Sequence, residues 1–158
     1  MLFHGVSASF RRIFTVLLSL VLVIGSTLGS TSCVVVRKVH EWQARAAAEE
    51  AVRGFRLDLD HEVYHGIYAG ASEHLQHGVT EEIYTKYLRT VHELMGNSSA
   101  SRQVSAQAVT NPDGIFVSLK YNTQFSQGMG LELFQWTVRD GRPLLYAYYF
   151  DSSRLRHP

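Results

Sequence analysis

The sharpest chemical pattern in the sequence is the segment HEVYH, residues 61–65, which has the spacing H-E-x-x-H. On a helix, residues four apart share one face, so the imidazoles of His61 and His65 could bind the same zinc ion. Glu62 could then accept a proton from a zinc-bound water. This pattern predicts a zinc-dependent hydrolase with His61 and His65 as metal ligands and Glu62 as the base.

The residues around this segment favour another interpretation. A catalytic zinc normally has three protein ligands, but Ala71 stands where the extended form of the motif has its third histidine. Tyr68 stands where that form has glycine, and a chain with eight histidines matches the short form readily by chance. We therefore expect no metal cofactor, no catalytic residues, and a solvated surface at His61, Glu62 and His65. Three further histidines are interpreted as belonging to solvated loops: His74, His77 and His92.

Cys33 is the only cysteine in the chain, and the residues before it follow a recognisable pattern. Arg11 and Arg12 precede the apolar run at residues 13–24, and small polar residues fill positions 25–32. A cationic start, an apolar stretch and small residues after it are typical of a secretory signal. The stretch at residues 30–33, STSC, resembles the lipobox of bacterial lipoproteins, although Ser30 stands where leucine is preferred. The resemblance implies that Cys33 carries a lipid, such as palmitate, after cleavage.

Two other fates of the N-terminal segment stay open. Ser30 and Ser32 also suit an ordinary signal-peptidase site, which would release a soluble protein. Residues 13–36 contain no charge, and that length is close to the ~20 residues that span a bilayer, so an uncleaved anchor is the other alternative. In all three cases the rest of the chain is exported. With one cysteine it forms no intrachain disulfide, so its stability must come from its core.

Length and composition indicate one packed domain after this segment. The chain has 158 residues, of which 46% are hydrophobic and 18% charged, and its formal net charge is +1. That near-neutral charge gives no reason to expect a nucleic-acid partner. We expect residues 1–33 to be the signal or lipoprotein segment and residues 34–158 to form one domain.

Helical patterns dominate the first part of that domain, from about residue 38 to residue 96. Residues 34–54 are rich in alanine, glutamate and arginine, and residues 55–71 repeat apolar residues at helical spacing. A second helical unit begins after Thr80, which can cap it, and ends at Gly96. Asn97–Ser101 is predicted to be a polar loop.

The pattern then changes to strands, between about residues 102 and 151. Residues 103–109, 115–122, 131–139 and 144–150 are predicted strands, and turns are predicted at residues 111–114 and at Asp140-Gly141. Helices followed by an antiparallel meander predict an α+β fold, with N-terminal helices packed on one face of a curved four-stranded antiparallel sheet.

This order resembles the cone-shaped, cystatin-like fold of nuclear transport factor two, ketosteroid isomerase and the SnoaL-type proteins. The stretches that carry the resemblance are YHGIYAGAS (64–72), YNTQF (121–125), GLELFQW (130–136) and LLYAYYF (144–150). More specifically, the chain is similar to small exported bacterial proteins of this class with no assigned function. The family's enzymes place acids inside the cone, and no matching pattern is identified in this sequence. The resemblance also implies a possible pocket inside the cone, lined by Tyr64, Tyr68, Tyr121 and Trp136.

Aromatic residues on the predicted strands indicate where a partner would bind. Strand residues alternate between two faces, so about half of these side chains face away from the helices. We expect Phe134, Trp136 and Tyr149 to form an outward apolar patch, which a second copy or another envelope protein would cover. The sequence thus predicts a membrane-tethered envelope protein with a non-catalytic role in binding or self-association. The alternatives are the zinc hydrolase above and a pocket for a small apolar ligand inside the cone.

Overall fold

The computed structural model describes the backbone of residues 29–152 and the side chains of residues 36–152. The chain divides into two compact units, Met1–Val39 and His40–Pro158. The predicted export segment lies outside the described residues, apart from the helical backbone that begins at Gly29, and so does the side chain of Cys33. Among the described helices, none is long and apolar enough to cross a membrane.

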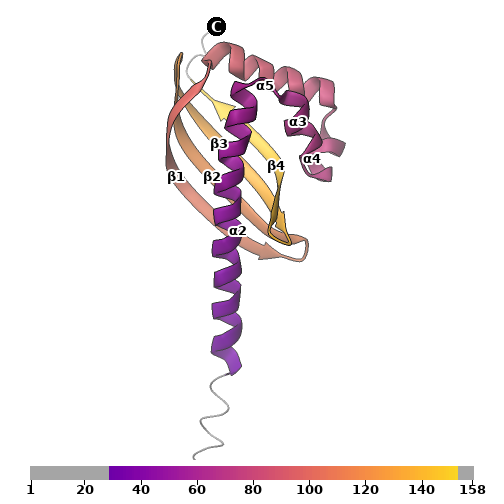
Figure 1. The fold of residues 1–158 in the computed structure, drawn as a ribbon. Coiled ribbons are helices and arrows are strands. Elements are labelled where there is room, and N and C mark those ends of the chain that lie inside the picture. Colours follow the sequence, from indigo (N-terminus) through magenta and orange to yellow (C-terminus); the bar gives the residue numbers. More distant parts are fainter. Residues whose placement is uncertain (1–28, 153–158) are drawn as a thin grey trace, which may run out of the picture. The chain divides into compact units, whose positions relative to one another are not determined.

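Four helices precede four strands in the described part of the chain (Figure 1). The helices are α2 (Gly29–Asp60), α3 (Tyr64–Ala69), α4 (Glu73–Gly78) and α5 (Glu81–Met95). The strands are β1 (Ser98–Asn111), β2 (Gly114–Phe125), β3 (Gly128–Arg139) and β4 (Arg142–Asp151). They form one antiparallel sheet in the order β1-β2-β3-β4. The predicted α+β fold is therefore confirmed.

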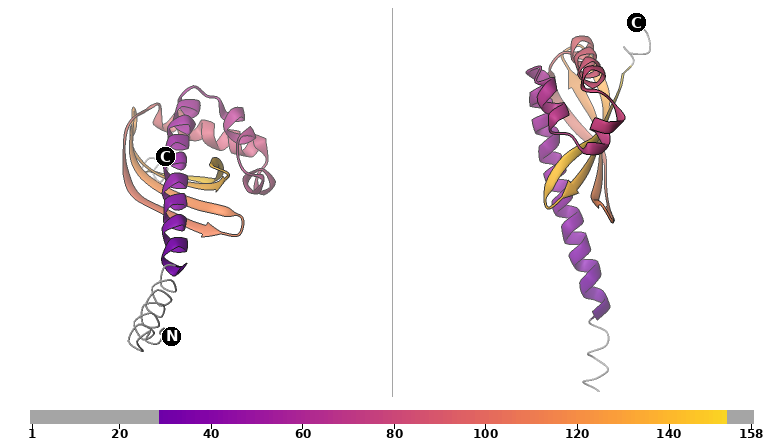
Figure 2. Two further views of the ribbon diagram at one scale, coloured as in Figure 1. Left: turned by 60° about the horizontal axis from the view of Figure 1, so that its bottom comes forward. Right: turned by 90° about the vertical axis from the view of Figure 1, so that its right-hand side faces the viewer.

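The core lies between the helices and one face of the moderately curved sheet (Figures 1 and 2). Helix α2 buries residues spaced three or four apart, which places them on one stripe: Ala44, Ala48, Val52, Phe55 and Leu59. The Phe55 ring meets the Phe134 ring edge-on, with centroids 5.1 Å apart, and so joins α2 to β3.

Helix α5 has the ends that the sequence predicts. The Thr80 hydroxyl accepts a hydrogen bond from the Ile83 N–H, and Gly96 ends the helix with a positive φ of 68°. The Asp140-Gly141 turn is confirmed as well, because both residues have positive φ, as a two-residue hairpin requires.

Two predicted boundaries are wrong. Residues 55–71 are not one continuous helix: α2 ends at Asp60, a turn follows, and α3 begins at Tyr64. Residues 97–101 are not a loop, because β1 already begins at Ser98 and pairs there with the end of β2. Since β1 is an edge strand with mostly exposed or half-buried side chains, its polar composition resembles that of a loop.

The predicted outward patch is also wrong in two of its three residues. Phe134 and Trp136 are buried against the helices, with 0% and 5% exposure, while Tyr149 is 57% exposed. The pairing of β3 with β4 shifts between Gln135 and Trp136, which leaves Tyr146 as an extra residue in β4. This bulge changes the phase of β4, so that Tyr148 faces the core and Tyr149 faces away.

Candidate functional site

The segment that suggested a zinc hydrolase is divided by the end of a helix. His61 and Glu62 lie in the turn after α2, where Glu62 has a positive φ of 60°. His65 belongs to the first turn of α3, and its Nδ1 lies 2.5 Å from Oε1 of Glu81. The two imidazoles therefore do not share the face of one helix, which the proposed zinc site requires. All three side chains are exposed, as expected.

Potential metal ligands do not gather elsewhere in the described part of the chain either. Within residues 36–152, no three histidine, cysteine, aspartate or glutamate side chains come together in a way that could hold a metal ion. The prediction that His74, His77 and His92 lie in loops is wrong. His74 and His77 belong to the short helix α4, and His92 belongs to α5.

A buried ion pair joins α2 to the inner face of the sheet. Arg56 on α2 donates hydrogen bonds from Nε and Nη2 to Oε2 of Glu132 on β3, at 3.0 and 2.6 Å. The Glu132 side chain is fully buried, and that of Arg56 is 12% exposed. The Thr123 hydroxyl donates to the same carboxylate oxygen at 2.5 Å, and the Tyr148 hydroxyl donates to the other oxygen at 3.2 Å. Both oxygens of the carboxylate are thus occupied.

The guanidinium group of Arg56 also makes a further hydrogen bond and a contact with an aromatic ring. Its Nη1 donates to the Ser101 hydroxyl at 2.8 Å, and its central carbon lies 4.7 Å from the centre of the Tyr121 ring. Ions are tolerated in a protein interior only when they are paired and hydrogen-bonded in this way. The cluster of Arg56, Glu132, Thr123 and Tyr148 therefore connects two layers of the fold.

Sequence reasoning missed this cluster, although one half of it leaves a signal. Glu132 precedes Phe134 by two residues and Trp136 by four, so all three share one face of β3. Once Phe134 is assigned to the core, Glu132 must be there too. Arg56 leaves no such signal, because it lies 76 residues earlier in the chain.

The four aromatic residues predicted to line one pocket have separate environments. Tyr64 is buried with the guanidinium of Arg89 5.8 Å from its ring, and the Tyr68 hydroxyl donates to the backbone carbonyls of residues 76 and 79. The Tyr121 hydroxyl accepts a hydrogen bond from a side chain of β1. Of the four, Trp136 lines a groove.

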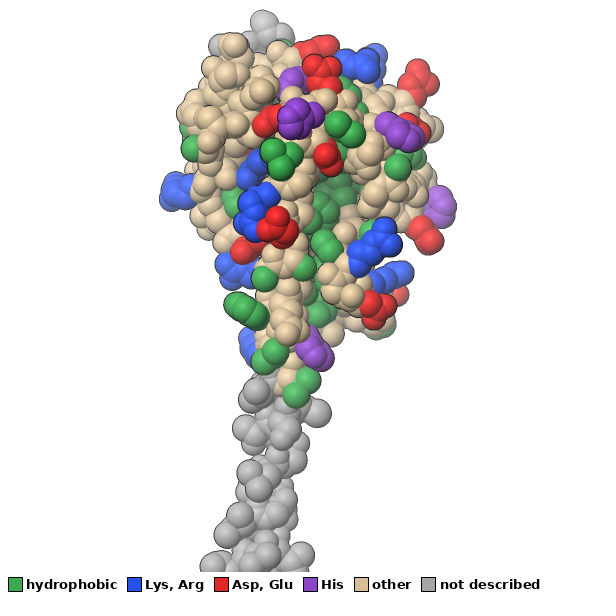
Figure 3. Space-filling view, viewed as in Figure 1, with side chains coloured by type: hydrophobic (Ala, Val, Ile, Leu, Met, Phe, Trp, Pro, Cys, Tyr) green, Lys and Arg blue, Asp and Glu red, His purple; other side chains and the backbone are tan. Residues whose placement is uncertain are grey.

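This groove lies between α2 and α3 and has a volume of about 190 Å³. Small residues make room for it on both sides: Ala51 and Gly54 on α2, Gly66 on α3, and Gly70 directly after α3. A Cβ atom added to Gly54 would meet nothing within 4 Å. Figure 3 shows apolar side chains in the hollow between α2 and the short helices beside it.

One residue that lines the groove carries a buried polar group without a partner. Trp136 is 5% exposed, and its indole Nε1 has no hydrogen-bond partner among the described residues. An unpaired buried donor costs about 1–3 kcal/mol, so a hydrogen-bond acceptor that enters the groove would remove this cost. Asp58 lies at the same groove with an exposed carboxylate. The groove therefore has apolar walls, and one of its lining residues carries an unpaired donor. Mostly apolar walls with a few polar groups are usual in small-ligand sites.

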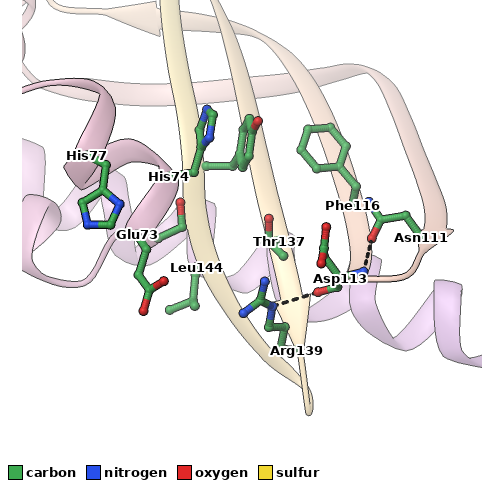
Figure 4. Close-up of a pocket in the computed structure, with 11 residues that line it drawn as sticks. Glu73, His74, His77, Asn111, Asp113, Phe116, Thr137, Arg139 and Leu144 are labelled. Carbon is green, nitrogen blue, oxygen red and sulfur yellow. Dashed lines mark hydrogen bonds between the residues drawn. The ribbon is translucent and has the colours of Figure 1, made fainter.

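A second hollow, of about 650 Å³, lies on the other side of the sheet (Figure 4). The His74 ring stacks on the Tyr146 ring with centroids 3.9 Å apart, and Arg139 Nε donates to the backbone carbonyl of Asp113 at 2.8 Å. Figure 4 shows Glu73 and His77 on one side of this hollow and Asp113 and Arg139 on the other.

One comparison with known proteins identifies the family. A family described as a protein of unknown function (DUF4019) matches residues 35–146. The chain belongs to this family. The matched range of DUF4019 includes the groove, Arg56 and Glu132, and it begins two residues after Cys33. No curated protein matches the chain.

Tyrosines around the buried carboxylate of the DUF4019 domain have altered acidity. Burial raises the pKa of Tyr148 well above its ordinary value, and the neighbouring Glu132 carboxylate raises it further. Burial also raises the pKa of Tyr87 to about 12, although the hydrogen bond from the Phe150 N–H to its hydroxyl lowers it. These hydroxyls therefore stay protonated to a higher pH than ordinary tyrosines do.

Proposed function

We propose that this DUF4019 chain is an exported, membrane-tethered protein of the cell envelope that binds an apolar ligand group and does not catalyse a reaction. The tether is supported by the sequence pattern before Cys33 and by the start of the family match at residue 35. We extend the proposal to lipidation of Cys33 and to the class of nuclear transport factor two, whose helix-on-meander order the chain shares.

The non-catalytic role is supported by the state of the acidic groups. Glu132 is the buried acid on the inner face of the sheet, and both its oxygens accept hydrogen bonds from neighbouring side chains. Glu62, the base of the alternative hydrolase, lies in an exposed turn and does not line the groove. A group that transfers a proton to a bound substrate must be within reach of that substrate. The buried Glu132 carboxylate is out of reach, and the Glu62 carboxylate is open to water.

The observation that carries the binding role is the groove at Trp136. A cavity of about 150 Å³ with apolar walls binds benzene in another protein, so 190 Å³ suffices for an aromatic ring or a branched aliphatic group. The unpaired indole N–H adds a requirement for a hydrogen-bond acceptor beside that group. The same chemistry is offered by a small aromatic alcohol and by an apolar side chain of a peptide with its backbone carbonyl.

Filling the groove tests this role. Gly54→Leu adds a side chain where the groove is open, and Gly78→Leu adds the same side chain at a helical glycine outside it that is equally unobstructed. The probe is 4-fluorobenzyl alcohol, and the readout is the indole N–H signal of Trp136 in a ¹H–¹⁵N NMR spectrum. We expect a downfield shift in the wild type and in Gly78→Leu, and no shift in Gly54→Leu.

Two outcomes would count against the groove. If the Trp136 indole N–H signal does not shift when the probe is added to the wild type, the groove does not bind a group of this kind. If Gly54→Leu responds as the wild type does, the probe binds elsewhere. As a further control, 4-fluorotoluene fills the same space without an acceptor, so it should broaden its own ¹⁹F signal without moving the indole N–H downfield.

A second candidate function, self-association, is favoured by the outer face of the sheet. Leu133 and Tyr149 lie directly opposite each other on β3 and β4, and both face away from the helices. We propose that a second copy of the chain covers them. Sedimentation of Leu133→Glu should then show monomers where the wild type shows dimers, while Met129→Glu, at an exposed position near the β2–β3 turn, should leave the dimer intact. A monomeric wild type would rule this function out.

A further inference from the structure

We propose that Trp42, on the solvent-facing side of α2, lies in the headgroup region of the membrane that holds the N-terminal anchor. The proposal rests on the tether proposed above and adds to it a contact that orients the domain. Trp42 is the most exposed of the large apolar side chains described, with 69% of its surface accessible.

The position of Trp42 on its helix gives it no role in the core. The buried stripe of α2 begins at Ala44, and two residues correspond to roughly 200° around a helix, so Trp42 points away from the sheet. Single exposed apolar residues are common, but tryptophan is the side chain that prefers the boundary between lipid and water, because its ring is apolar and its N–H is polar. An exposed Trp42 therefore suits a membrane surface better than it suits water.

The distance along the chain also favours this occupant. Trp42 is nine residues after Cys33, so even a fully extended chain keeps it within roughly 30 Å of the proposed anchor. Arg37 and Lys38 lie between the two positions, and the first acidic residue of the chain is Glu41. Basic residues next to an anchor are attracted to the anionic lipids of a bilayer. The proposed anchor, the two basic residues and Trp42 thus follow one another within ten residues, as expected of a segment that lies against a membrane surface.

The test uses the full chain inserted through its own N-terminal segment into vesicles of phosphatidylethanolamine and phosphatidylglycerol. Trp136 contributes a buried background, which is removed by subtracting the spectrum of Trp42→Phe. We expect Trp42 emission to move to the blue on insertion. We also expect acrylamide quenching of Trp42 to fall at least about twofold, since much of the indole leaves water in the headgroup region. Lipid brominated near its carbonyl groups should quench Trp42 strongly.

A matched control places tryptophan at the other end of the helix–sheet contact. Met129 is 54% exposed and lies near the Asp60 end of α2, where Ser98 bonds to Asp60 and pairs with Phe125. That end is 18 residues, or ~27 Å, from Trp42 along the helix. Met129→Trp in the Trp42→Phe background should be quenched by acrylamide and not by brominated lipid.

The possible results distinguish the anchor at Cys33 from the membrane contact of Trp42. Palmitate labelling that disappears in Cys33→Ala reports the anchor independently of Trp42. A labelled chain whose Trp42 stays open to acrylamide and untouched by brominated lipid would overturn the contact while leaving the anchor intact. A Trp42 emission that is already blue-shifted before insertion, in a chain that sediments as a dimer, would overturn it in favour of a second copy.

Discussion

Removing the positive charge from the buried ion pair should destabilise the domain far more than removing a similar charge from its surface. Arg56→Met keeps most of the apolar stem but leaves the fully buried Glu132 carboxylate with only the Thr123 and Tyr148 hydroxyls as partners. Breaking a buried pair in this way typically costs about 3–5 kcal/mol. The loss of the guanidinium from the Tyr121 ring adds up to about 1 kcal/mol.

The contribution of the ion pair to stability is best measured as a coupling free energy between Arg56 and Glu132. Glu132→Leu alone leaves Arg56 unpaired, but its side chain is 12% exposed and keeps the Ser101 hydroxyl, so we expect a smaller cost of about 1–3 kcal/mol. In Arg56→Met/Glu132→Leu neither charge remains, and apolar replacements of buried pairs are often neutral or stabilising. The double variant should therefore unfold within about 1 kcal/mol of the wild type, well below the sum of the two single costs.

Urea unfolding at neutral pH, followed by circular dichroism, measures these free energies. The matched control is Arg45→Met on the same helix, where the pair with Glu49 is 43% and 33% exposed and should contribute less than about 1 kcal/mol. The reasoning would be refuted if the two single costs simply added in the double variant. A cost of Arg56→Met no larger than that of Arg45→Met would refute it equally.

Three smaller predictions follow from the tyrosines and from a helix cap. Tyr84→Phe removes a buried hydroxyl without a partner among the described residues and should be neutral or stabilising, whereas Tyr148→Phe removes a donor to the buried carboxylate and should cost about 1.5–3 kcal/mol in urea unfolding. Burial raises the pKa of Tyr87 in the folded chain from 10.0 to about 12. The contribution of this hydroxyl to stability is therefore complete below pH 10 and is lost as the pH rises towards 12. Urea midpoints should fall across that window, and a constant midpoint would contradict the shift. Thr80→Ala removes the cap of α5 and should lower the free energy of unfolding by about 1 kcal/mol, an effect that Thr80→Ser should largely reverse.

Local residue patterns could predict most of the fold, because they depend on neighbours in the chain. The apolar spacing of α5 between its Thr80 cap and Gly96, and the two-residue turn at Asp140-Gly141, are set by backbone geometry over a few residues. Where tertiary contacts decide, the pattern misleads: residues 55–71 keep helical spacing across the turn at His61 and Glu62. That turn separates the two histidines that the sequence alone assigns to one helical face.

By itself, the sequence determined the order of helices and strands and the antiparallel meander, since each follows from residues close together in the chain. The export signal before Cys33 stays a prediction from the same kind of local pattern. The tertiary structure alone decided the candidate site. Arg56 meets Glu132 across 76 residues, and the groove at Trp136 exists because Gly54 on one helix and Gly66 on another leave room beside the same strand. Packing between distant segments selects such contacts, and nothing in the local sequence specifies which segments will meet.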